Sequence, residues 1–132
     1  MKKLITQFTK FGVVGFMNTV IDFLVYTGLT RVFLFWDEHK VLAACLAFII
    51  ANINSYVLNK YWTFTNKEKD HRIQYTKFLA VSLVGLGLNL LIFYSLIEFG
   101  LYDLIAKIAP IPIILLWNFV INKIWTFKKK FV

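Results

Sequence analysis

Long apolar runs separated by short polar segments make up nearly the whole sequence. The runs cover residues about 11–35, 41–62, 78–101 and 104–125. Each is close to the roughly 20 residues that an α-helix needs to cross a hydrocarbon core about 30 Å thick. A transmembrane barrel would instead alternate apolar and polar residues over segments of about 10 residues. The runs show no such alternation, so the pattern predicts an all-α membrane protein with four transmembrane helices.

The first apolar run does not have the features of a cleaved signal peptide. It is long, it contains Asn18 and Asp22, and it lacks a clear small-x-small cleavage site. We therefore count it as the first transmembrane helix.

The two halves of the chain repeat each other. SYVLNKYWTF at residues 55–64 matches NFVINKIWTF at 118–127, and TKFGVVGFMNTVIDFLVY at 9–26 matches TKFLAVSLVGLGLNLLIF at 76–93. We expect a single transmembrane domain over residues 1–132, with one helical hairpin at about 9–64 and a second at about 76–127. Because each hairpin has two spans, the copies share one orientation, and a pseudo-twofold axis along the membrane normal should relate them.

Composition and charge agree with a membrane protein. Hydrophobic residues make up 59% of the chain and the mean hydropathy is +0.67, whereas soluble domains average roughly 45–50% apolar residues. The net charge of +8 comes from 15 Lys and Arg against 7 Asp and Glu. Twelve of those cations lie before span one, between spans two and three, or after span four: Lys2, Lys3, Lys10, Lys60, Lys67, Lys69, Arg72, Lys77, Lys123, Lys128, Lys129 and Lys130.

This distribution predicts the orientation of the protein. The two other connections hold only Arg31, Lys40 and Lys107, together with four acidic residues, Asp37, Glu38, Glu98 and Asp103. By the positive-inside rule, both termini are cytoplasmic and the other two connections are external. Topology and attraction to anionic lipid explain the basic excess better than nucleic-acid binding does.

The sequence contains little of the chemistry that enzymes and metal sites use. Cys45 is the single cysteine, so no intrachain disulfide can form. His39 and His71 stand alone, no residues have metal-ligand spacing, and no glycine-rich phosphate loop is present. We expect no metal and no cofactor, and an enzyme is the weakest interpretation, because one carboxylate without a paired nucleophile makes a poor active site.

The doubled NK-x-WTF motif is typical of a helix end at the membrane surface. Trp62 and Trp125 belong at the inner headgroup level, where an indole can place its apolar body and its single donor. Lys60 and Lys123 can extend their ammonium groups toward the cytoplasmic surface. On its own, the motif is explained by interfacial anchoring.

Anchoring does not explain the polar residues inside the membrane near the same ends. They are Asn52, Asn54, Ser55 and Asn59 in span two, and Asn118 and Asn122 in span four. Amides in hydrocarbon need partners, and they usually face the bundle interior or a wet cavity. Two interpretations stay open here: a polar route for a substrate, or hydrogen bonds that join the helices.

Asp22 is the one acidic residue deep in an apolar run, with Asn18 one turn earlier. A carboxylate at that depth costs at least about 2.5–3.5 kcal/mol on insertion scales, so a functional role is the default hypothesis. It could be protonated, pair with a cation, or bond to Asn54 or Asn118.

Cations stand at both ends of the spans. Lys107 stands where span four begins and Arg31 ends span one, while Lys60 and Lys123 lie at the opposite face. A cation at each face would suit a substrate that carries phosphate.

These features together resemble the GtrA-like family of small four-span membrane proteins. The matching segments are TKFGVVGFMNTVID at residues 9–22, NKYWTF at the end of span two, the basic connection after it, and WNFVINKIWTF at 117–127. The resemblance covers about residues 8–128. The copies differ where Ser55 matches Asn118 and where Asn89 matches Asp22, so the two halves should not be equivalent.

The resemblance implies that the protein moves a polyprenyl-phosphate-linked sugar, such as undecaprenyl-phosphate glucose, across the bacterial cytoplasmic membrane. The transported lipid-linked sugar would be used in cell-surface polysaccharide synthesis or teichoic-acid glycosylation, and a membrane glycosyltransferase would be the partner that uses it. A homo-oligomer would enclose more volume than four helices. The expected substrate-binding residues are Asn18, Asp22, Asn54, Ser55, Asn59, Lys60, Lys107, Asn118, Asn122 and Lys123.

Two other functions account for some of the same residues. A non-transporting anchor for a glycosyltransferase would use the polar groups for assembly. A small multidrug-type, proton-coupled exporter would explain four spans and Asp22, but not the doubled motif or the amides near it.

Overall fold

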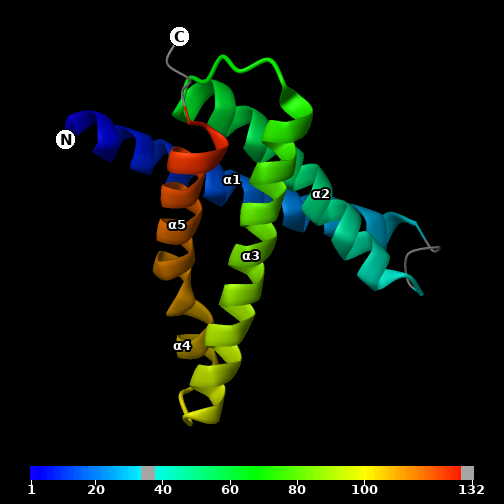
Figure 1. Cartoon of the computed structure of the whole chain (residues 1–132). Helices are drawn as coiled ribbons and strands as arrows, with labels where there is room; N and C mark the ends of the chain where they lie inside the picture. Colours follow the sequence, from blue (N-terminus) through cyan, green and yellow to red (C-terminus); the bar gives the residue numbers. More distant parts are fainter. Residues whose placement is uncertain (34–37, 129–132) are drawn as a thin grey trace. The chain divides into compact units, whose positions relative to one another are not determined.

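The computed structural model describes residues 1–33 and 38–128, and within them the regular structure is entirely helical (Figure 1). Four helices are long and apolar enough to cross a membrane: Lys2–Val32, Lys40–Thr63, His71–Glu98 and Asp103–Thr126. The predicted all-helical, four-span fold is therefore confirmed. Asp37, Lys129 and Lys130, which entered the charge argument, lie outside the described residues. The orientation of the termini, the pseudo-twofold axis and the single domain over residues 1–132 stay predictions.

The first compact unit, Met1–Lys67, is one helical hairpin. It contains α1 (Lys2–Val32), α2 (Lys40–Leu58) and the short π-helix η2 (Asn59–Thr63). Ala43, Ala47 and Ala51 recur every four residues and are 0% exposed, because α2 packs against α1 along this stripe. Small side chains at that spacing let two helix backbones approach closely in a membrane.

The second compact unit, Glu68–Val132, repeats this arrangement. It contains α3 (His71–Glu98), α4 (Asp103–Ile108), α5 (Pro110–Ile121) and the π-helix η3 (Asn122–Thr126). Asp70 caps α3 by accepting a 3.3 Å hydrogen bond from the Ile73 N–H. Gly100, with φ +89°, takes the left-handed conformation in the turn that ends the helix. Figure 1 shows α5 alongside α3.

Span four begins at Asp103, close to the start of the fourth apolar run, and it contains two prolines near its start. The helix α4 meets α5 at Ala109. Ala109 itself keeps helical torsion angles, φ −56° and ψ −37°. Pro110 and Pro112 have no N–H to donate to the carbonyls four residues earlier, so the hydrogen-bond ladder is interrupted at this point.

Large apolar side chains cover the outer faces of both units. Phe16 and Phe23 on α1 are 72% and 67% exposed, and Leu91 on α3 is 64% exposed. In water such surfaces would drive aggregation, but lipid acyl chains match them. The exposed residues and the span lengths together describe a multi-pass membrane protein.

Candidate functional site

Both NK-x-WTF motifs form the same unusual turn. In η2 the Phe64 N–H donates to the Asn59 carbonyl at 2.9 Å, and in η3 the Phe127 N–H donates to the Asn122 carbonyl at 2.8 Å. These bonds span five residues, where an α-helix would span four. Short π-helical turns of this kind are rare and are often found at functional sites. The repeat therefore extends from sequence to backbone conformation.

A buried asparagine organises each of these turns. Asn59 and Asn122 are each 1% exposed. The Thr63 hydroxyl donates to Asn59 Oδ1 at 2.8 Å, and the Thr126 hydroxyl donates to Asn122 Oδ1 at 2.7 Å. On the other side, Asn59 Nδ2 donates to Ser55 Oγ at 3.3 Å and Asn122 Nδ2 donates to the Asn118 carbonyl at 2.7 Å. Each amide thus links the last α-helical turn to the π-helical turn of its own helix.

The start of each hairpin packs against this turn. The rings of Phe11 and Phe64 lie 6.1 Å apart in the first unit, and those of Phe78 and Phe127 lie 5.9 Å apart in the second. All four rings are almost fully buried. The Thr-Lys-Phe segment and the Trp-Thr-Phe segment, which the sequence matches separately, therefore form one structural element in each copy.

Lysine and tryptophan pair at the rim of each element. Lys10 Nζ lies 5.3 Å from the Trp62 ring centre, and Lys77 Nζ lies 5.5 Å from that of Trp125. The two indoles are 43% and 47% exposed. Rings that are half covered, each next to a cation, fit the predicted position at the membrane surface.

Buried acceptors without donors occur farther along two of the spans. Asn18 Oδ1 on α1 and Asn118 Oδ1 on α5 are both covered, and no described residue donates a hydrogen bond to either. Asn118 Oδ1 lies so close to Gly85 on α3 that a Cβ added there would be 2.8 Å away. The glycine thus makes room for the amide.

The other predicted residues within the spans are less enclosed. Asp22 and Asn54 are half-buried on α1 and α2. Within the described part of the first unit, no residue forms a hydrogen bond or ion pair with the Asp22 carboxylate. Lys107 is exposed on α4, near the end of its unit opposite η3. Among the described residues, no group of three His, Cys, Asp or Glu side chains is placed to hold a metal ion.

Comparison with known proteins identifies the family. Residues 10–127 match the family described as "GtrA/DPMS, transmembrane domain". The chain belongs to this family. The match covers most of the chain and includes both copies of the NK-x-WTF segment, so the predicted resemblance is confirmed.

Two Bacillus subtilis (strain 168) proteins are similar to this chain over most of their length. The "uncharacterized membrane protein YngA" is 31% identical over 127 residues, which cover 96% of this chain and 83% of YngA. The "uncharacterized membrane protein YwcD" is 26% identical over 121 residues, which cover 89% of this chain and 93% of YwcD.

The two motif lysines of this GtrA/DPMS protein differ in environment. Lys60 is 1% exposed, and its ammonium donates to Asn66 Oδ1 in the following connection at 3.3 Å. Lys123 is half-buried, with its ammonium 6.0 Å from the Phe119 ring centre. Lys60 therefore fixes the connection to the helix end, whereas Lys123 is the more accessible cation of the pair.

A buried glutamine lies near the start of the first helix in each hairpin, where that helix packs against the π-helical turn. The sequence analysis did not identify these two glutamines. Gln74 on α3 is 4% exposed, and its Nε2 donates to the Thr126 carbonyl in η3 at 3.2 Å. Gln7 has the matching position on α1 and is 8% exposed. A signal was present, because the repeat reads QFTKF at residues 7–11 and QYTKF at 74–78, two residues longer than the Thr-Lys-Phe match.

Proposed function

We propose that this protein moves a polyprenyl-phosphate-linked sugar across the bacterial cytoplasmic membrane without catalysing a reaction on it. The observation that carries the proposal is the buried side-chain oxygen of Asn118, Oδ1, which has no donor among the described residues and faces Gly85. A buried acceptor left unsatisfied costs about 1–3 kcal/mol. Sugar hydroxyls are donors that would satisfy it, and Asn18 on α1 offers a second acceptor of the same kind.

The lipid part of such a substrate needs no protein path. The prenyl chain can stay in the bilayer while only the phosphate and sugar cross, so a route with a few polar groups is sufficient. Lys107 lies near one end of the second unit and Lys123 near the other, and either ammonium can bind a phosphate. Asp22 can accept a hydroxyl or carry a proton.

The direction of movement would come from supply and use of the lipid. We found no sequence motif for a nucleotide-driven motor, and a protein shifts an equilibrium only by its different affinity for the two states. Charging of the carrier on the cytoplasmic side and consumption by a glycosyltransferase outside would then drive net transport. On this proposal, the transported lipid-linked sugar serves polysaccharide synthesis or teichoic-acid glycosylation.

One observation favours a second function, that of an anchor for a membrane glycosyltransferase. Asn59 and Asn122 use their side chains for bonds inside their own helices, and Gln74 bonds to the Thr126 carbonyl. Much of the motif's polarity therefore serves to shape the helix ends. A helix end of fixed shape is also what a docking partner needs.

Transport by purified protein in liposomes separates the two functions. A fluorescent short-chain polyprenyl-phosphate sugar is placed in the vesicles, and its exposure to an external quencher is followed. We expect wild-type protein to expose it much faster than empty liposomes do. Asn118→Leu, Asp22→Asn and Lys107→Ala should each slow exposure on the order of tenfold, which corresponds to about 1.4 kcal/mol in the barrier.

Lys67→Ala is the matched control for Lys107→Ala, because Lys67 is an exposed lysine in the central connection. It should leave the rate unchanged. Circular dichroism and gel filtration must show that each variant is folded. If well-folded wild-type protein exposes lipid no faster than empty vesicles, the transport proposal is wrong and the anchor function is favoured. Uptake of a cationic drug that needs Asp22 but none of the lysines would instead indicate an exporter.

A further inference from the structure

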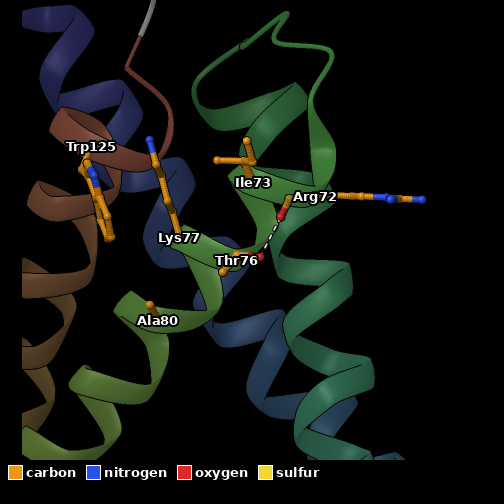
Figure 2. A pocket seen from close by; sticks show the side chains of 6 residues that line it. All are labelled: Arg72, Ile73, Thr76, Lys77, Ala80 and Trp125. Atoms are coloured by element: carbon orange, nitrogen blue, oxygen red, sulfur yellow. Dashed lines mark hydrogen bonds between the residues drawn. The ribbon is translucent and has the colours of Figure 1, made fainter.

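A cavity of about 330 Å³ opens between the first turns of α3 and the end of η3 (Figure 2). Ile73, Thr76, Lys77 and Ala80 follow one another at helical spacing and form one wall, because residues three and four apart share a helix face. Trp125 forms the other wall, and Arg72 lies at the rim with its side chain pointing away from Trp125. None of these residues carries the proposed transport.

The cavity combines an apolar floor with two hydrogen-bond donors. Ile73, Ala80 and the face of the Trp125 ring supply the apolar surface. The half-buried Lys77 ammonium lies 5.5 Å from the Trp125 ring centre. In the described part of the chain, no carboxylate pairs with Lys77, and no group accepts from the Trp125 indole N–H. An ammonium and an indole N–H beside each other, both lacking an acceptor, are complementary to an anion.

The position of the cavity along the chain indicates where that anion would be. Lys77 is the last charged residue before the third apolar run, and Trp125 is 47% exposed. Lysine and tryptophan at the ends of spans lie at the level of the lipid headgroups. An occupant must therefore present a negative group at the headgroup level and an apolar chain below it.

We propose that this cavity binds an anionic phospholipid of the surrounding leaflet. The phosphate accepts from the Lys77 ammonium and the Trp125 indole N–H, and the acyl chain lies along Ala80 and the face of the Trp125 ring. A zwitterionic lipid has the same phosphate but brings its own cation close to Lys77, so it binds more weakly. This site is independent of whether the protein transports a lipid-linked sugar.

The test measures lipid binding to delipidated full-length protein by native mass spectrometry. Phosphatidylglycerol and phosphatidylcholine with identical acyl chains are titrated separately, and we expect phosphatidylglycerol to bind more tightly. Lys77→Gln should weaken phosphatidylglycerol binding about fivefold, the factor that one lysine contributes near an anionic surface. Trp125→Phe keeps the ring but removes the N–H, so it should also weaken binding.

Two further variants separate the site from general charge effects. Lys77→Arg keeps a cation that can bind phosphate, so it should retain most of the phosphatidylglycerol binding that Lys77→Gln loses. Lys67→Gln removes the same charge from an exposed lysine outside the cavity and should bind like wild type.

Three results would overturn the proposal. The first is equal binding of both phospholipids, and the second is equal weakening by Lys67→Gln and Lys77→Gln. The third is tight binding of polyprenyl phosphate with no measurable phosphatidylglycerol binding, which would assign the cavity to a transported lipid.

Discussion

At the level of single residues, the buried asparagines of the NK-x-WTF motifs have a structural explanation. Asn59 and Asn122 each accept from a threonine four residues later and donate to a group four residues earlier. A buried amide has donor and acceptor groups that must be satisfied, and these bonds use both sides of it. Asn118 differs because its Oδ1 has no donor among the described residues, which is why it is central to the proposed route.

Gly85 provides a direct test of the Asn118 position. Gly85→Ala would place a Cβ 2.8 Å from Asn118 Oδ1, so the amide must move. Alanine also raises helix propensity by about 1 kcal/mol relative to glycine, and overpacking costs about 1–3 kcal/mol. A Cβ added at Gly87 would meet no atom within 4 Å. Gly87→Ala therefore measures the effect of helix propensity on stability without any overpacking.

We therefore expect Gly85→Ala to be less stable than Gly87→Ala by at least about 1 kcal/mol. The measurement is the midpoint of SDS-induced unfolding in mixed micelles. Adding Asn118→Ala to Gly85→Ala should recover part of the loss, because it removes the atom that the new Cβ meets. Equal midpoints for the two glycine variants would contradict the described packing of α3 on α5.

At the level of elements, each hairpin closes by packing the start of its first helix on the π-helical end of its second. The contacts recur in both units: a phenylalanine pair and a lysine over a tryptophan. This explains why the sequence repeats both segments. Neither would be buried without the other.

A double-mutant cycle tests this closure in the second unit. Phe78→Leu and Phe127→Leu each replace a ring that is 3% exposed, and aromatic pairs contribute about 0.5–1.5 kcal/mol beyond the area they bury. The double variant should therefore lose less stability than the sum of the single variants, by about that amount. Phe99 lies at the far end of α3 and is 83% exposed. The cycle of Phe78→Leu with Phe99→Leu should show no coupling, and similar coupling in both cycles would reject the contact.

At the level of the whole molecule, the charge distribution predicts how the chain lies in the membrane. Labelling of single cysteines in a Cys45→Ser background tests this in intact cells. A membrane-impermeant maleimide should reach Tyr102→Cys from outside. Lys69→Cys and Lys128→Cys should react only after permeabilisation, because basic segments stay cytoplasmic. The reverse pattern would exchange the inner and outer roles assigned to Lys107 and Lys123.

The sequence alone was sufficient for the four spans, the internal repeat and the family. Run length and hydropathy determine whether a segment can cross a membrane, and both are properties of consecutive residues. Trp62 and Trp125 have half-exposed rings, and their place at the membrane surface stays a prediction. Small residues four apart favour one contact face, and Ala43, Ala47 and Ala51 form such a face in the structure.

The tertiary structure decided which polar groups are available. Lys60 and Lys123 occupy equivalent places in the motif, yet Lys60 is buried against Asn66, a residue outside the repeat. Asn59 and Asn122 bond within their own helices, an outcome that the sequence left open. Gln74 gains its role from Thr126, 52 residues away. These outcomes depend on which neighbour satisfies each donor and acceptor, and that is settled only when the helices pack.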